Sequence, residues 1–255
     1  MSVIGALATA SFREAFRNRV TVVLGVFAVV MILLTSVVLN TTVFTLDRAV
    51  TDFGLGVMSL LLVGLTIFLS AGLLTREIER RTIFLVVSRP VSRAAFIFGR
   101  YLGTLVTLLL LQAVMTGLYL LQFALFDVPL TQAVVAALLG LVVELVLLTA
   151  IGFFFSSFSG QLVSGVSAVG LYLIGHLSGD MYLVSRTNES PVLASLARIG
   201  YYVLPNLDRL DYRVTAAHQG TVHWGEFAGS CAYGLVYAAL LLLAATLIFD
   251  RRDFK

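Results

Sequence analysis

The chain has 255 residues, of which 59% are hydrophobic and only 12% are charged, and its mean hydropathy is +1.00. Soluble domains carry about 25% charged residues, so this composition excludes an ordinary soluble domain. The net charge is +3, and basic clusters set among long apolar blocks do not form the basic face that nucleic-acid binding needs. The single cysteine, Cys231, excludes an intrachain disulfide.

The first predicted element is an amphipathic helix over residues 2–18. Its apolar side chains fall on one helical face, and Arg13, Glu14, Arg17 and Arg19 follow towards its end. This pattern favours a helix that lies on the membrane surface; a disordered tail is the alternative. The apolar block that follows is too long for a signal peptide and lacks an A-x-A cleavage site, so we expect an uncleaved first span.

Six blocks of about 20 apolar residues predict six transmembrane helices. A hydrocarbon core of about 30 Å needs this length at about 1.5 Å per residue. The sequence therefore predicts an all-α integral membrane protein with a single transmembrane domain over residues 1–255. The predicted spans are 20–39, 54–74, 96–122, 133–155, 162–178 and 227–249.

The distribution of basic residues predicts the orientation. With the N-terminus inside, twelve Arg and Lys residues fall on the cytoplasmic side and five on the other. Cytoplasmic loops carry the excess of Arg and Lys in membrane proteins. Both termini are therefore predicted to be cytoplasmic, in a multi-pass protein of the bacterial inner membrane.

The predicted cytoplasmic segment 75–93 combines charge with an apolar run. A charged turn comes first, the apolar residues 83–87 follow, and Pro90 ends any helix there because proline disfavours helical backbone at the residue before it. A basic loop needed only for topology would explain the Arg residues, but it would not explain five apolar residues in a wet loop. We expect these residues to lie on the bilayer or in a groove of another protein.

This segment, with the motif Gly99-Arg-Tyr-Leu-Gly103 after it, resembles the permeases of type-two ATP-binding-cassette (ABC) transporters. That family includes permeases of copper-enzyme maturation and of gliding motility. The resemblance implies a coupling helix at 76–93 that docks on a separate ATPase subunit. The family often has Gly where this chain has Arg81. The implied coupling residues are Arg76, Glu77, Glu79, Arg80, Arg81, Thr82, Ile83, Phe84, Leu85, Ser88, Pro90 and Arg93.

The chain lacks a nucleotide-binding motif of its own. A Walker A motif needs Gly-Lys-Ser/Thr, and the sole lysine is Lys255. The resemblance therefore implies that ATP and Mg²⁺ bind to a partner ATPase. It implies that this chain binds no cofactor and is not itself an enzyme. It also implies that a second permease copy, identical or homologous, completes the complex within the lipid bilayer.

Two sets of residues inside the spans are candidates for function. Glu144 lies at the middle of the fourth span, where an ionised carboxylate is costly, and Gln112 lies at a similar depth in the third span and could bond to it. Glu144 could line a pathway, or it could fasten two helices as a protonated acid. Small residues let helices approach closely, and Ser164, Gly165 and Ala168 of the fifth span are candidates for a dimer seam.

The external segment 179–226 carries an amphipathic stretch and two histidines. Residues 191–204 have apolar side chains at helical spacing and precede Pro205, which predicts a short helix on the outer leaflet or over the bundle. His218 and His223 are five residues apart with no cysteine beside them, so we expect a solvated loop there and no metal site. His176 lacks an obvious Ser or Cys partner for catalysis.

The function expected from these features is the permease subunit of an ABC transporter, an exporter whose apolar spans suit a lipid-like or amphiphilic cargo or a mechanical role. Two alternatives stay open. One is a secondary transporter or channel that needs no ATPase, and the other is a subunit that anchors a larger assembly in the membrane.

Overall fold

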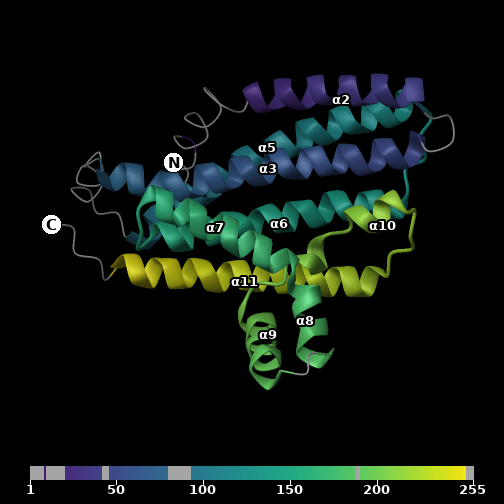
Figure 1. Cartoon of the computed structure of the whole chain (residues 1–255). Helices are drawn as coiled ribbons and strands as arrows, with labels where there is room; N and C mark the ends of the chain where they lie inside the picture. Colours follow the sequence, from purple (N-terminus) through teal and green to yellow (C-terminus); the bar gives the residue numbers. More distant parts are fainter. Residues whose placement is uncertain (1–8, 10–20, 42–45, 80–92, 188–189, 251–255) are drawn as a thin grey trace.

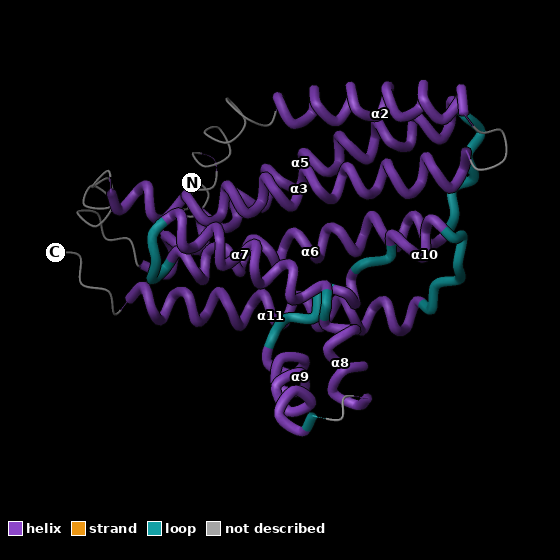
Figure 2. The backbone as a smooth tube through the Cα atoms, viewed as in Figure 1, coloured by secondary structure: helices purple, strands orange, loops and turns teal. Residues whose placement is uncertain are grey.

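The structure is a computed structural model that describes Thr9 and residues 21–41, 46–79, 93–187 and 190–250. These residues are helical almost throughout, with no strand among them, and short loops join the helices (Figure 2). The predicted amphipathic helix 2–18 lies outside the described residues, apart from Thr9.

Five of the six predicted apolar blocks each coincide with a helix, and the fifth, 162–178, extends two residues past the end of its helix. The helices are α2 (Thr21–Thr41), α3 (Leu46–Glu79), α5 (Arg93–Leu125), α6 (Gln132–Ser156), α7 (Gln161–His176) and α11 (Trp224–Asp250). Helices α2, α3, α5, α6 and α11 lie side by side along one direction (Figure 1). Successive helices run in opposite senses, so α3, α6 and α11 end at the end of the bundle where α5 and α7 begin.

Helix α6 lies at the centre of the bundle. Apolar residues surround it on every side, which is the pattern of a helix buried on all faces, and it packs against α3, α5, α7 and α11. Its first turn is capped by Thr131, whose hydroxyl accepts a hydrogen bond from the Val134 amide at 3.4 Å. At Gly152 the helix comes so close to α3 that a Cβ atom would overlap the Ser70 hydroxyl.

The fifth predicted span, 162–178, is not a straight membrane-crossing helix. Helix α7 has 16 residues, about 24 Å in length, and it ends at His176. The chain then bends by 56° into α8 (Ser178–Thr187). The sequence predicts a straight span here because an apolar block shows how many apolar residues follow one another. It does not show whether the helix axis bends.

Helix α8 pairs with α9 (Pro191–Val203) in a hairpin that projects from the side of the bundle, across the direction of the long helices (Figure 1). Helix α9 confirms the predicted short helix, and it begins with Pro191 and ends before Pro205. It has no buried residue within this chain, and its apolar residues stay exposed.

The connection from α9 to α11 returns to the bundle. It contains a short 3-10 helix, η2 (Asp208–Leu210), and α10 (Arg213–Ala217), which packs between α3 and α6. At Gly140 of α6 a Cβ atom would overlap the Leu210 carbonyl oxygen, so this position needs glycine for the connection to lie against α6.

Candidate functional site

A buried carboxyl group on α6 meets side chains from other elements. Glu144 is 2% exposed and lies midway along α6. Its Oε1 atom lies 3.5 Å from Nε2 of His176 at the end of α7. The predicted partner, Gln112, does not reach it, because its Nε2 atom donates to the Leu138 carbonyl at 2.9 Å. Gln112 therefore ties α5 to α6 and is not part of this site.

His176 is positioned by the last turn of α7. Its Nδ1 atom lies 3.1 Å from the Tyr172 carbonyl oxygen, and the Tyr172 and His176 rings are in contact, with centroids 4.4 Å apart. This arrangement turns Nε2 away from its own helix and towards Glu144. The bend after His176 allows the imidazole to lie inside the bundle.

An ion pair from the returning connection completes the site. The Arg213 guanidinium donates from Nε and from one terminal nitrogen to the two oxygens of Asp211, at 2.8 and 2.5 Å. Its other terminal nitrogen donates to the Ser59 hydroxyl of α3 at 3.0 Å. Asp211 Oδ2 in turn lies 4.0 Å from His176 Nε2. The four side chains Glu144, His176, Asp211 and Arg213 are called the polar cluster below.

The Asp211–Arg213 pair is a strong one. Burial alone would raise the pKa of Asp211, but the hydrogen bonds and charge of Arg213 outweigh it and hold that pKa below its usual value. The hydrogen bonds to Asp211 likewise raise the pKa of Arg213 against the effect of its burial. Asp211 is therefore a carboxylate under ordinary conditions. The pKa of neighbouring Asp208 is shifted the other way, because burial and the charge of Asp211 raise it.

Backbone and amide contacts hold the connection in place beside the polar cluster. The Gly175 carbonyl accepts from the Leu207 amide at 3.1 Å. The Asn206 side-chain oxygen accepts from the Ser178 hydroxyl at 2.6 Å and from the Arg209 amide at 3.2 Å. The backbone N–H of Asn206 donates to the Tyr233 hydroxyl of α11 at 3.1 Å. The bend between α7 and α8 and the start of the connection therefore form one bonded unit.

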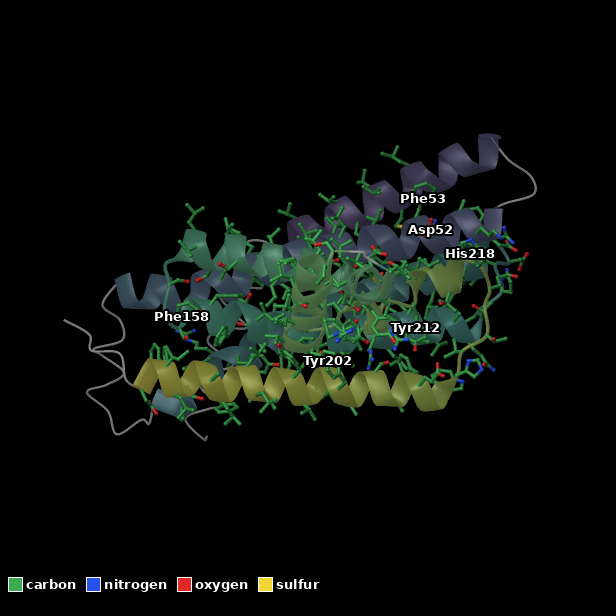
Figure 3. All side chains as sticks on the ribbon, turned by 60° about the horizontal axis from the view of Figure 1, so that its bottom comes forward. Asp52, Phe53, Phe158, Tyr202, Tyr212 and His218 are labelled. Atoms are coloured by element: carbon green, nitrogen blue, oxygen red, sulfur yellow. The ribbon has the colours of Figure 1, made fainter. Side chains whose placement is uncertain are left out.

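Tyr212 extends the site towards α11. Its ring contacts Phe227 edge-on, with centroids 5.2 Å apart, and Phe227 contacts Trp224, the sole tryptophan, at 5.6 Å. Tyr212 is labelled in Figure 3, among the side chains beside α11. A row of three aromatic rings thus connects the residue between Asp211 and Arg213 to the beginning of α11.

The proposed dimer-seam residues lie on the inner face of α7. Ser164 and Ala168 are fully buried within this chain, and the Ser164 hydroxyl lies 2.8 Å from that of Ser159. A Cβ atom at Gly165 would approach Ala71 of α3 at 3.9 Å. Ser164 and Ala168 therefore pack within the single copy, whereas Gly165 is partly exposed. The outer face of α7 instead exposes Leu162, Val163, Val166, Val169 and Leu173.

The coupling residues divide between described and undescribed parts of the chain. Arg76, Glu77 and Glu79 belong to the last turns of α3, and Arg93 is the first residue of α5. The others lie outside the described residues: Arg80, Arg81, Thr82, Ile83, Phe84, Leu85, Ser88 and Pro90.

The histidines of the connection lie apart from the polar cluster. His218 is exposed, with Nδ1 at 2.9 Å from the Val214 carbonyl oxygen, and His223 is exposed as well. Among the residues that the structure describes, no three His, Cys, Asp or Glu side chains are grouped as metal ligands would be.

The sequence contains Glu144, His176, Asp211 and Arg213 but no signal that pairs them. Glu144 and His176 lie far in the chain from each other and from the neighbouring Asp211 and Arg213, which belong to a segment predicted to lie outside the membrane. A buried Glu does indicate that a partner must exist. His176, near the end of the fifth apolar block, is the residue of the sequence that could indicate this partner.

The helices define the class of protein. Within the described residues, four helices are long and apolar enough to cross a membrane, and five if α7 and α8 are counted as one bent span. The apolar part of α2 with described side chains, Val22–Leu33, is shorter. This is the structure of an all-α membrane protein. The chain belongs to a family of proteins of unknown function, DUF2705, whose family model matches residues 28–255. No curated protein matches it.

Proposed function

We propose that this chain is the transmembrane permease subunit of an ABC transporter, an exporter driven by ATP hydrolysis on a separate subunit. The observation that carries the proposal is the pattern of residues 76–93, with its charged turn, its apolar run and its Ser-Arg-Pro-Val-Ser-Arg sequence between two long apolar helices. A segment of this composition needs a protein or membrane surface to cover its apolar side chains.

The length of α3 supports this interpretation. The helix has 34 residues, about 50 Å, whereas its apolar sequence ends at Leu74. It therefore continues past the apolar layer with the charged residues Arg76, Glu77 and Glu79. Such an extension can carry the segment after it away from the bilayer to where a soluble ATPase subunit could bind.

Six crossings with both termini cytoplasmic fit the alternating directions of the helices. In this topology α2, α3, α5, α6, the bent α7–α8 pair and α11 are the six crossings. The ends of α3, α6 and α11 and the starts of α5 and α7 then share the cytoplasmic side, which carries twelve of 17 basic residues. The location that follows is the bacterial inner membrane.

In the proposed mechanism two permease copies form the pathway and two ATPase subunits each hold one 76–93 segment. Closure of the ATPase pair on ATP and Mg²⁺ displaces these segments, and α3 and α5 transmit the displacement into the bundle. The exposed apolar face of α7, with Val163 and Val166, is the surface that we assign to the second copy.

A double substitution tests the coupling segment. Phe84→Asp with Leu85→Asp places two charges where the ATPase groove would be apolar, and we expect complete loss of transport-stimulated ATPase activity in proteoliposomes with the partner ATPase. The matched control, Phe84→Leu with Leu85→Ile, keeps the surface apolar and should retain most activity. Membrane insertion should be normal in both.

Purification in mild detergent separates this function from its competitors. A stoichiometric ATPase subunit that co-purifies with the wild type and is lost from the Asp double variant supports the proposal. Transport in proteoliposomes without any ATPase would identify a secondary transporter or channel. Full coupling in the Asp double variant would contradict docking through Phe84 and Leu85.

A further inference from the structure

Two buried polar atoms in the polar cluster face each other without a hydrogen bond. Glu144 Oε1 and His176 Nε2 are both buried, and neither has a hydrogen-bond partner among the described residues. They are 3.5 Å apart. Buried polar atoms in folded proteins are nearly always satisfied, so what lies between these two atoms has to be explained.

The tautomer of His176 decides the nature of that contact. Its Nδ1 atom lies 3.1 Å from the Tyr172 carbonyl oxygen. A carbonyl oxygen only accepts, so Nδ1 carries a hydrogen. In a neutral imidazole Nε2 then presents a lone pair, and an ionised Glu144 would point a second lone pair at it. That arrangement would be repulsive in an apolar bundle.

We propose that Glu144 and His176 form a proton-binding site that holds one proton between Oε1 and Nε2, in addition to the hydrogen on Nδ1. With this proton the two facing atoms become a donor and an acceptor, whichever of them carries it. The site joins α6 to the end of α7. The inference does not rest on the transport function proposed above.

Among the described charged groups around the pair, the Arg213 guanidinium opposes a bound proton, but its charge is paired with that of Asp211. Asp211, 4.0 Å from Nε2, is engaged by Arg213 and does not need the proton. From the other elements, α7 contributes the Tyr172 ring, α3 the Ser59 hydroxyl that Arg213 binds, and η2 the Asp208 carboxyl. Loss of the proton would leave the Glu144 and Asp211 carboxylates both facing His176.

The site exchanges its proton from the side of the connection. The side chain of Glu144 is 3% exposed, whereas those of His176, Asp211 and Arg213 are 18%, 15% and 26% exposed. The open edge of the cluster is therefore formed by residues of the α7 end and of the connection. Deprotonation would weaken the attachment of both to α6.

Unfolding of the full chain in detergent at different pH values tests the site. An unfolded chain holds no corresponding proton above about pH 6.5, since unperturbed Glu and His titrate at about 4.3 and 6.5. The folded chain binds one proton more, so stability falls as pH rises, and the unfolding equilibrium constant increases about tenfold per pH unit between about pH 7 and the pH at which the pair releases its proton.

Glu144→Gln is the deciding variant. Its side-chain amide can donate permanently to Nε2, so the unfolding constant should lose this tenfold dependence while the fold is kept. Asp127→Asn is the control, because it removes one exposed carboxylate in the loop between α5 and α6 and should keep the wild-type slope. A level wild-type profile, or a wild-type slope in Glu144→Gln, would overturn the proposal.

A second measurement needs no variant. Unfolding the wild-type chain with sodium dodecyl sulfate in weakly buffered solution at about pH 8 should release about one proton per chain to a pH indicator dye. Release of no proton, or uptake of one, would refute the proton site even if Glu144→Gln failed to fold.

Discussion

Arg213 connects three parts of the molecule through one side chain. It binds Asp211 beside it in the connection and Ser59 on α3, and the pair it forms lies next to His176 and Glu144. Because Asp211 is only 15% exposed, removal of the guanidinium would leave a carboxylate with little water to solvate it. Removing one partner of a buried ion pair lowers the free energy of unfolding more than replacing both partners by apolar residues does.

We expect Arg213→Met to lower the free energy of unfolding by about 1–3 kcal/mol. The matched control is Arg198→Met on exposed α9, which should change it by less than about 0.5 kcal/mol. Thermal unfolding of the purified chain in detergent measures both. Equal effects of the two substitutions would show that Arg213 does not hold the connection.

The same pair predicts a loss of stability in acid. The pKa of Asp211 is lowered in the folded chain, so its contribution is present above the unfolded value of about 3.9 and is lost as pH falls through the folded value. The wild-type chain should therefore lose stability below about pH 4. In Arg213→Met the part of this loss that comes from Asp211 should disappear, and unfolding in detergent at a series of acidic pH values measures it.

At the scale of elements, close contacts between helices depend on individual glycines. Gly152 on α6 faces the Ser70 hydroxyl, with no room for a methyl group, whereas Gly117 on α5 has no atom within 4 Å of the place that a methyl group would occupy. Both lie inside helices, where alanine has the higher helix propensity. Alanine substitutions at the two positions therefore distinguish the effect of helix–helix packing from the effect of helix propensity.

Gly152→Ala should cost about 1–3 kcal/mol because α3 and α6 must separate. Gly117→Ala should leave stability unchanged or raise it by up to about 1 kcal/mol. Melting temperatures of the two variants in the same detergent measure the difference. A destabilised Gly117→Ala together with a neutral Gly152→Ala would mean that α3 and α6 do not meet at Ser70.

The helices could be predicted from the sequence because each apolar block is long and uninterrupted, as in the 25 residues of α6. Helix α9 could be predicted because Pro191 and Pro205 bracket an amphipathic pattern. The bend after His176 could not, since the apolar pattern continues through it. The polar cluster could not either, because its contacts depend on how the connection returns between α3 and α6.

The hydrogen-bond partner of Gln112 could not be predicted from the sequence either. Gln112 lies at a depth similar to that of Glu144, which made it a reasonable partner, but depth does not fix the rotation of a helix about its axis. In the folded chain Gln112 meets the backbone of Leu138. The small residues of α7 were likewise a sign of close packing, but the pattern does not distinguish packing within one copy from packing between two.

At the scale of the whole molecule, the proposed topology predicts which sites face which side of the membrane. In a Cys231→Ser background, Asp127→Cys and His218→Cys should react with a membrane-impermeant maleimide on intact cells, since both residues are exposed in loops assigned to the outside. Lys255→Cys should react only after permeabilisation. Labelling of all three in intact cells would contradict six crossings with both termini inside.

Helix α3 is continuous from Leu46 to Glu79, without a proline or a break. A continuous α-helix of this length behaves as a rod, so its two ends cannot be displaced independently. A tilt of about 5° about one end moves the other by about 4 Å over a length of about 50 Å, which exceeds the length of a hydrogen bond. Ser59, which holds Arg213, lies along this rod. A tilt of α3 that is imposed at Glu79 therefore also displaces Ser59 and changes its contact with Arg213.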